Sequence, residues 1–381
     1  MTLVEPLSEE QLNRVYSPIL SPLIWDLGHI ANFEEQWLIR EIAGREALRG
    51  DLGDLYDAIE QPRRVRGELP ILTAGEVFPY MEQVRERTLE VLDDLDLDPG
   101  NPLLADGFVY EMLLAHEHQH NETMLQLLQM IESYEPVRTD VGPAGEPVAD
   151  GPETVEVPGG EHTIGAGSAE QGFAYDNERP RHTVELDAFE IDRTPVTNAD
   201  YMRFLDENPD VEPPMYWERD GEGGWARTSM GRRDDVDPAL PVIHVSWHEA
   251  NAFARWAGKR LPTEFEWEAA ATGADCERAN LDLFAFSPAP AGAYGDAPSD
   301  HGALQMLGDV WEWTSSEFEG HPGFAPFPYP EYSEVFFGES YKVLRGGAWS
   351  ARRNVIRPTF RNWDNPERKQ IFSGFRCVRD I

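Results

Sequence analysis

Three histidines in the first third of the chain have the spacing of metal ligands. His116 and His120 are four residues apart in a segment that we expect to be helical, so one helical face carries both imidazoles, about 5–6 Å apart. His29 follows Trp25 at the same interval on a separate stripe of large apolar residues. Two such faces inside one bundle would bring the three imidazoles together. The sequence therefore predicts a three-histidine metal site, although a histidine on an apolar stripe can also be a satisfied core residue.

Three histidine ligands narrow the identity of the metal but do not determine which reaction it catalyses. Three imidazoles suit Fe, Zn, Cu or Ni and leave coordination positions for other ligands, whereas Mg and Ca prefer oxygen donors. Zinc-dependent hydrolysis and oxygen chemistry at iron are both compatible with this set. His118 lies off the stripe, so we expect it to be solvated. We expect Glu117 and Glu122 to be exposed helix carboxylates or acceptors for the ligating histidines.

Helix signals frame these residues. Ser21 and Pro22 have the types of an N-cap and a first helical residue, and Gly44 is a stop signal for the first segment. A capping-box sequence at 73–76 begins a second periodic segment. A third segment, which carries the paired histidines, begins near Asp106. Amphipathic segments of this kind predict a helical bundle over residues 1–136.

The composition changes after the third helical segment. Residues 137–154 are rich in proline, glycine and acidic residues and predict a linker. Beyond it, over residues 155–381, short apolar runs alternate with turn residues, and two amphipathic helices are expected at 198–205 and 247–257. We therefore expect an α+β second domain that is rich in loops.

The overall charge excludes one large class of partners. Among 381 residues there are 32 basic and 70 acidic side chains, which gives a formal net charge of −38. A protein that binds nucleic acid needs a basic surface, so we expect no nucleic-acid partner. Three of the basic residues are lysines and the rest are arginines. We expect a halophilic protein of a salt-rich cytoplasm, because salt screens the self-repulsion of such a surface.

Cysteine content and hydropathy favour a cytoplasmic protein. Cys276 and Cys377 are too few for a disulfide framework or a structural zinc site. No segment approaches the ~18 apolar residues of a membrane span, and the first residues lack the basic and apolar regions of a secretion signal. We expect no membrane partner.

Longer motifs resemble a known enzyme family. DLGHIANFEEQW around His29 and HEHQHNE at 116–122 are similar to the DinB-like bundle of the ergothioneine-pathway sulfoxide synthases, which are iron(II) enzymes that join a thiol to trimethylhistidine (hercynine). The second half resembles the formylglycine-generating enzymes, or sulfatase-modifying factors. The motifs that carry this second resemblance are VPGGEHTIG, PVIHVSWHEANAFARWAGKRLPTEFEWEAAATG, LGDVWEWTSS, VLRGGAW and GFRCVRD. The resemblance implies an α+β protein with a DinB-like four-helix bundle followed by a C-type-lectin-like domain.

One departure separates the chain from the formylglycine-generating enzymes. Those enzymes carry a reactive cysteine pair, used with copper, just after the RGG-type motif. This chain has SARRNVIRPTFRN there, without a cysteine, so we do not expect that chemistry. We expect Cys377, in the closing GFRCVRD strand, to be a small buried hydrophobic residue, and Cys276 to lie in a loop.

The resemblance implies roles at matching positions. The implied iron(II) ligands are His29, His116 and His120. The positions similar to those that contact hercynine are Gln119, Asn362 and Trp363, and the Trp363 ring could also face the quaternary ammonium as a cation–π partner. A packed core aromatic is the alternative for Trp363. Asp364 matches the carboxylate that meets the ammonium group of the thiol substrate.

Arginines and tyrosines complete the implied site. Arg63 and Arg66 have the R-x-x-R spacing with which family members that favour γ-glutamylcysteine bind its carboxylates; Arg64 competes for the same register, and an exposed basic loop is the alternative. Tyr329 and Tyr332 are candidates for a proton or electron donor, and we favour Tyr329. The implied reaction consumes one O2, forms a C–S bond to hercynine and oxidises the sulfur to a sulfoxide. We expect γ-glutamylcysteine rather than cysteine as the thiol.

Other functions remain open at this point. A related synthase could use another thiol, a selenium donor or histidine, as in ovothiol-type synthesis. A thiol transferase or hydrolase could use a divalent metal on the same bundle without O2. A non-catalytic binding module is a third possibility, because a fold does not determine a function. The sequence leaves the oligomeric state and the position of C–S attachment open.

Overall fold

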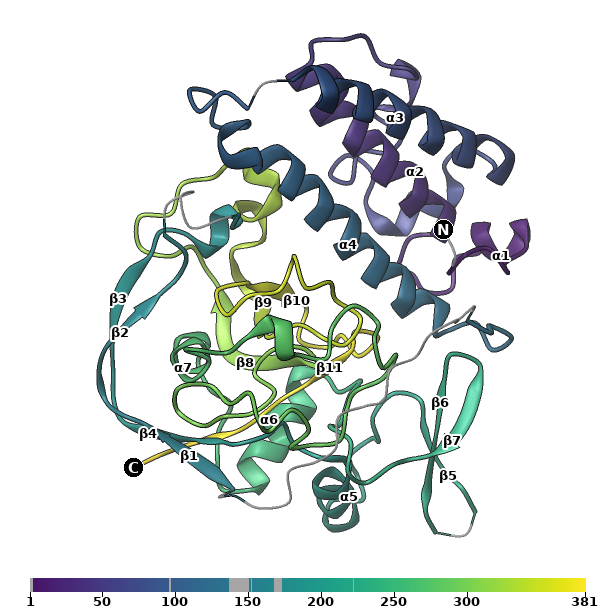
Figure 1. Cartoon of the computed structure of the whole chain (residues 1–381). Helices are drawn as coiled ribbons and strands as arrows, with labels where there is room; N and C mark the ends of the chain where they lie inside the picture. The colour runs from purple at the N-terminus through teal and green to yellow at the C-terminus, as the bar shows by residue number, and fades with distance from the viewer. Residues whose placement is uncertain (1–2, 96, 137–150, 152, 168–172, 222) are drawn as a thin grey trace. The chain divides into compact units, whose positions relative to one another are not determined.

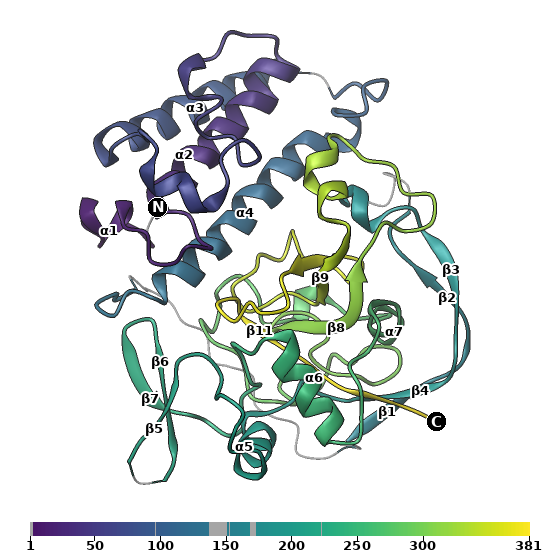
Figure 2. The ribbon, with the colours of Figure 1, turned by 180° about the vertical axis from the view of Figure 1, so that it is seen from behind.

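The computed structural model describes residues 3–95, 97–136, 151, 153–167, 173–221 and 223–381. The chain divides into two compact units, Met1–Val137 and Arg138–Ile381, which we call unit 1 and unit 2 (Figures 1 and 2). The linker expected at 137–154 lies outside the described residues, apart from residues 151, 153 and 154. Each unit is described by itself.

Unit 1 is helical. Its described residues form the α-helices α1 (Glu9–Asn13), α2 (Leu23–Glu34), α3 (Ala74–Asp94) and α4 (Phe108–Leu128). A π-helical segment, Glu35–Ile42, continues α2 without a break, and short 3-10 segments lie at Gly50–Leu52, Arg63–Glu68 and Ala105–Gly107. Helix α2 packs against both α3 and α4 (Figure 1). The remaining α-helix among the described residues of unit 1, α1, has five residues and contacts α2.

The predicted helix starts are confirmed in two cases and wrong in one. Thr73 forms the predicted capping box of α3, and α4 begins at Phe108, close to the predicted start. Ser21 is not the N-cap of α2, because Pro22 takes that position and no side chain caps the helix. The Ser21 hydroxyl instead accepts a hydrogen bond from the buried Arg66 Nη1 at 2.7 Å.

Helix α2 is the central element of unit 1. Every one of its residues except Phe33 is buried. A helix that is buried on all sides must satisfy its polar side chains within the protein, because water cannot reach them. The polar residues of α2 are therefore fixed by specific partners.

The described residues of unit 2 form four sheets of short strands. The described strands are β1 (Thr154–Val157), β2 (Gly160–Ile164), β3 (His182–Leu186), β4 (Phe189–Asp192), β5 (Trp217–Arg219), β6 (Trp225–Ser229), β7 (Arg232–Asp235), β8 (Trp311–Phe318), β9 (Gly338–Arg345), β10 (Asn362–Asp364), β11 (Ser373–Gly374) and β12 (Val378–Asp380). Their orders are β1-β4-β12, β10-β9-β8-β11, β2-β3 and β5-β6-β7. Neighbouring strands are antiparallel except β11, which runs parallel to β8. The arrangement is the expected α+β fold.

Three helices accompany these sheets. They are α5 (Asn198–Glu207), α6 (Trp247–Trp256) and α7 (Glu264–Ala270), and each begins with a capping box. The first two confirm the expected helices, whereas helical periodicity did not predict α7, which has only seven residues. Helix α7 packs against β2, β8 and β9. No helix among the described residues is both long and apolar enough to cross a membrane.

Candidate active site

Helices α2 and α4 bring the three predicted histidines into one group. His29 comes from the middle of α2, and His116 and His120 come from successive turns of α4. Their candidate ligand atoms all lie within 4.8 Å of one another, and the Nε2 atoms of His29 and His116 are 3.2 Å apart. Among the residues that the structure describes, no other cluster of three such groups has this geometry. One metal ion could bind all three imidazoles.

Hydrogen bonds determine which nitrogen of two rings points toward the group. Nδ1 of His29 lies 2.6 Å from the backbone oxygen of Tyr56, and Nδ1 of His120 lies 3.0 Å from Oδ1 of Asp26. Carbonyl and carboxylate oxygens accept hydrogen bonds, so both rings carry the proton on Nδ1 and keep the Nε2 lone pair for a metal. Tyr56 reaches α2 because Gly28 has no side chain; a Cβ there would lie 2.3 Å from the tyrosine ring.

Asp26 is a functional candidate that the sequence analysis did not single out. It is 1% exposed and lies within the apolar sequence LIWDLGHI. A carboxylate inside an otherwise apolar buried helix needs a partner, because burial of an unpaired charge is costly. An acidic residue within an apolar helical sequence was thus the sequence feature that could have identified Asp26. Its partner in the structure is His120.

Aromatic rings stack on the imidazoles of His29 and His116. The Trp25 ring stacks on His29 with centroids 4.8 Å apart and an interplanar angle of 12°. The Phe33 ring stacks on His116 at 3.8 Å and 16°. Side chains confined in this way are preorganised, so little reorganisation is needed when a metal binds.

The protonation state of the rings suits a metal. Burial lowers the pKa of His29 and of His116 well below the usual range, and the nearby His120 lowers both pKa values further. Neutral imidazole is the form that ligates metals. The set of three imidazoles, together with the lowered pKa values of His29 and His116, fits a divalent transition metal such as Fe, Zn, Cu or Ni.

Glu117 and Glu122, the acidic residues of α4 nearest the paired histidines in sequence, have different environments. Residues 116–120 have the H-E-x-x-H spacing of zinc proteases, in which the glutamate is the general base. Here Glu117 pairs with Arg85 at 2.9 Å. Glu122 is buried, so the expectation of an exposed carboxylate is wrong for it. His118 is only half-buried, which leaves part of it in contact with solvent, and it is not a member of the metal-binding group.

The two predicted arginines have different environments. Arg63 is exposed, whereas Arg66 is 5% exposed and donates hydrogen bonds to three protein oxygens at 2.7 to 3.0 Å. Burial lowers the pKa of Arg66 to about 10. Its guanidinium lies 3.6 Å from the Trp25 ring centroid, and Trp25 stacks on His29. Guanidinium, indole and imidazole therefore form one continuous stack that ends at the histidine group.

In unit 2 the predicted tyrosine and tryptophan positions lie in one aromatic cluster. The Tyr332 ring packs edge-on against Trp363 at 5.7 Å, and Trp363 stacks on Phe318 at 4.1 Å. Tyr329 lies edge-on to Tyr332 at 6.4 Å. Burial raises the pKa of Tyr329 well above its usual range, so its phenol is protonated at neutral pH. Tyr175, which the sequence analysis did not single out, stacks on Tyr332 at 4.0 Å.

The predicted NWD segment forms the short strand β10 beside β9. Asp364 pairs with Arg368 at 3.1 Å, so the carboxylate that the resemblance assigns to a substrate ammonium already has a cationic partner. Oδ1 of Asn362 accepts a hydrogen bond from the backbone N–H of Trp363 at 2.9 Å. Gln119 belongs to α4 of unit 1, where it is half-buried between the two ligand positions.

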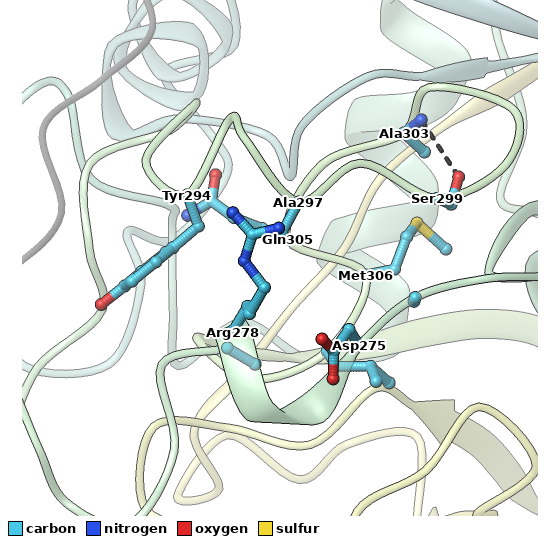
Figure 3. A pocket seen from close by; sticks show the side chains of 11 residues that line it. Asp275, Arg278, Tyr294, Ala297, Ser299, Ala303, Gln305 and Met306 are labelled. Atoms are coloured by element: carbon cyan, nitrogen blue, oxygen red, sulfur yellow. Dashed lines mark hydrogen bonds between the residues drawn. The ribbon is translucent and has the colours of Figure 1, made fainter.

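A separate small cavity of unit 2 contains none of the predicted site residues. Figure 3 shows Arg278 extending between Tyr294 and Asp275 at this cavity, with a hydrogen bond from the backbone N–H of Ala303 to Ser299 Oγ. About 10 Å³ is open to the centres of water-sized molecules, which is room for roughly one water. The cavity is too small for an organic substrate.

Each unit matches the model of a known protein family. Residues 1–124 match the family model of the DinB superfamily, and residues 140–381 match that of the sulfatase-modifying factor enzyme 1-like domain. The chain thus joins a DinB-type helical unit with a three-histidine group to a domain of the sulfatase-modifying type.

The chain is 40% identical to a hercynine oxygenase of Mycolicibacterium smegmatis, over 100% of this chain and 96% of the relative. It is 41% identical to a hercynine oxygenase of Mycolicibacterium thermoresistibile, over 98% of this chain and 90% of the relative. The chain belongs to the hercynine oxygenase family and is an oxidoreductase.

The chain is also similar to a formylglycine-generating enzyme, over a smaller share of its length. The formylglycine-generating enzyme of Streptomyces coelicolor is 32% identical over 63% of this chain and 92% of the relative. Cys377 is buried, as expected, and Cys276 is half-buried; both are free thiols. Burial raises the pKa of both thiols, which lowers the fraction of thiolate, the nucleophilic form, at neutral pH.

Proposed function

We propose that this chain is an iron(II)-dependent and O2-dependent sulfoxide synthase that joins hercynine to γ-glutamylcysteine. The observation that carries the proposal is the group of three oriented histidines in a chain that is 40% identical to a hercynine oxygenase over its full length. The imidazole C–H and the thiol S–H are replaced by a C–S bond. One oxygen atom of O2 goes to the sulfur, and the other leaves with the two hydrogens as water.

The histidine group provides the metal site of this reaction. His29, His116 and His120 would hold iron(II), which, when bound, supplies the redox chemistry with O2 and open positions for a thiolate. Because the three imidazoles are neutral ligands, they would leave a bound ion its full positive charge, which would favour a thiolate over a thiol. Tyr56 and Asp26 keep two of the rings in the ligating orientation.

The aromatic cluster of unit 2 provides candidate groups for hercynine and for proton transfer. The faces of Trp363 and Tyr332 suit a trimethylammonium group, because an aromatic ring attracts a cation over its face. The side-chain amide of Asn362, in the same unit, suits a hydrogen bond to this substrate. Tyr329, protonated at neutral pH, can donate a proton.

The choice of thiol depends on Arg63. Arg66 is buried and donates to three protein oxygens, whereas Arg63 is exposed and its Nη1 donates to the backbone oxygen of Ile19 at 3.4 Å, so Arg63 is the more accessible partner for a glutamyl carboxylate. Asp364 would meet the substrate ammonium while it also pairs with Arg368. Free cysteine lacks the glutamyl arm and gains nothing from Arg63. A preference for γ-glutamylcysteine follows.

The test is anaerobic reconstitution with iron(II), followed by addition of O2 in the presence of hercynine and either γ-glutamylcysteine or cysteine. Mass analysis should find the hercynine adduct of the thiol with one added oxygen atom. Zinc(II)-loaded protein and samples without O2 should give no adduct. Adduct formation with zinc, or without O2, would contradict the iron- and O2-dependent reaction. Absence of any adduct with iron(II) and O2 would contradict the proposal.

A further inference from the structure

We propose that Asp176 is a positioning residue for the segment that carries Tyr329 and Tyr332, a role that rests on the proposed function. This segment has little regular structure of its own. It consists of two single-turn 3-10 helices, Pro330–Tyr332 and Glu334–Phe336, preceded by Tyr329 in extended conformation. Such a segment has few internal hydrogen bonds, so its conformation depends on contacts with neighbouring elements.

The two carboxylate oxygens of Asp176 hold both ends of the tyrosine segment. Oδ2 accepts a hydrogen bond from the backbone N–H of Phe327 at 3.3 Å, two residues before Tyr329. Oδ1 accepts one from Ser333 Oγ at 2.5 Å, one residue after Tyr332. Asp176 is 3% exposed and Ser333 is fully buried. Water therefore does not compete for these bonds, and their loss is not compensated by solvent.

The residues on either side of Asp176 also contact the tyrosine segment, and we call Tyr175, Asp176 and Asn177 together the clamp. Asn177 Nδ2 donates to Ser333 Oγ at 3.0 Å, so the serine hydroxyl has both a donor and an acceptor partner. Tyr175 stacks on the Tyr332 ring. One three-residue stretch thus contacts the backbone, a side-chain hydroxyl and an aromatic ring of the tyrosine segment.

The clamp is itself anchored to the rest of unit 2. Residues 176–178 form a 3-10 turn, and the fully buried Glu178 accepts hydrogen bonds from the backbone N–H of Tyr175 at 2.8 Å and from Arg357 Nε at 2.8 Å. Thr359 Oγ1 donates to Glu178 at 2.7 Å. The bonds of Glu178 fix the turn at residues 176–178. A movement of the tyrosine segment would therefore break its hydrogen bonds to Asp176.

The substitution Asp176→Asn should separate positioning from folding. An amide has one acceptor oxygen and one NH2 group, so it cannot accept hydrogen bonds from Phe327 and Ser333 in the same way. A misplacement of about 1 Å at a reacting group can cost up to about a hundredfold in rate. We expect kcat to fall about 10- to 100-fold, with metal content and KM for γ-glutamylcysteine nearly unchanged.

Asp309→Asn is the matched control. Asp309 is likewise a buried carboxylate of unit 2 that accepts hydrogen bonds from a backbone N–H and from side-chain amides, those of Asn280 and Gln305, but it does not contact the tyrosine segment. It should lose stability in unfolding experiments as Asp176→Asn does, without the fall in kcat. An equal fall in kcat in both variants would overturn the proposal.

A double-mutant cycle measures whether the effect of Asp176→Asn on kcat depends on a tyrosine of this segment. A purely structural role of Asp176 would give no such dependence. Asp176→Asn is combined with Tyr329→Phe and, separately, with Tyr332→Phe. If Asp176 acts through a tyrosine, the aspartate substitution should have almost no further effect on kcat in one of these backgrounds. Effects that multiply in both backgrounds would overturn the proposal.

Hydrogen–deuterium exchange tests the clamp without any need for activity. Peptides that cover residues 327–336 should lose protection in Asp176→Asn and keep it in Asp309→Asn, compared at equal fractions folded. Unchanged protection in Asp176→Asn would overturn the proposal. An inactive wild type would contradict the proposed function, and the exchange result would still decide the role of Asp176.

Discussion

At the scale of single residues, two acceptors decide which nitrogen of a histidine can bind a metal. The backbone oxygen of Tyr56 does so for His29, and the carboxylate of Asp26 does so for His120. A side-chain substitution cannot remove the first acceptor, whereas it can remove the second. Asp26 therefore allows the orientation of a ligand to be tested separately from its presence.

Asp26→Asn should weaken iron(II) binding about 10- to 100-fold, because an amide is a weaker acceptor and can turn its NH2 group toward the ring. His120→Ala, which removes the imidazole, should abolish stoichiometric binding. Anaerobic iron(II) titration and metal analysis measure both effects. Glu34→Gln is the control, since Glu34 is a buried carboxylate of the same helix that pairs with Arg85. Full iron retention in His120→Ala would exclude His120 as a ligand.

Arg63→Ala should reduce kcat/KM for γ-glutamylcysteine by roughly ten- to a hundredfold and leave that for cysteine nearly unchanged. The reason is that a charge-assisted contact is worth about 1.5–3 kcal/mol and only the first thiol has a glutamyl carboxylate. The exposed neighbour Arg64 offers the control variant Arg64→Ala. A wild type that prefers cysteine, or an unchanged thiol ratio in Arg63→Ala, would show that the arginine is a surface residue.

At the scale of elements, Arg66 connects a 3-10 segment to the central helix of unit 1. Its guanidinium donates to Ser21 just before α2 and to the backbone oxygens of Ala58 and Gln61, and it covers the Trp25 ring. The loop between α2 and α3 is thereby tied to the helix that carries His29. This is a stabilising role that the sequence spacing of Arg63 and Arg66 did not predict.

Arg66→Ala should lower the free energy of unfolding by about 2–4 kcal/mol, since it leaves buried oxygens without donors and removes the stack on Trp25. Arg66→Lys should rescue little of this loss, because lysine lacks the planar fork of donors. Urea unfolding monitored by circular dichroism measures the difference. The exposed Arg63→Ala should change stability by less than about 0.5 kcal/mol. Equal stability of Arg66→Ala and wild type would contradict the role of Arg66.

At the scale of the whole molecule, the net charge of −38 sets the response to salt. From about 0.1 M to about 1 M salt the Debye length falls from about 10 Å to about 3 Å, which screens repulsion between surface carboxylates. Ion pairs at the surface weaken too, but each contributes little. We expect the melting temperature to rise with KCl concentration. Thermal melts over this range test the expectation, and a melting temperature that stays flat or falls would count against a halophilic protein.

Local patterns in the sequence were sufficient for much of the fold. The capping box at Thr73 and the helices at 198–205 and 247–257 depend on neighbours a few residues apart. Helix α7 escaped prediction because seven residues are too few to show a helical period. The Ser21 cap was wrong because a distant arginine uses its hydroxyl.

The sequence by itself also determined the candidate metal group, since the 3.6-residue period of a helix places His116 and His120 on one face. Only the tertiary structure decided what surrounds that group. The bond between His120 and Asp26 joins residues 94 positions apart, and the clamp from Asp176 to Ser333 spans 157 positions. Hydrogen bonds of this range depend on how buried elements pack, and no local period encodes that packing.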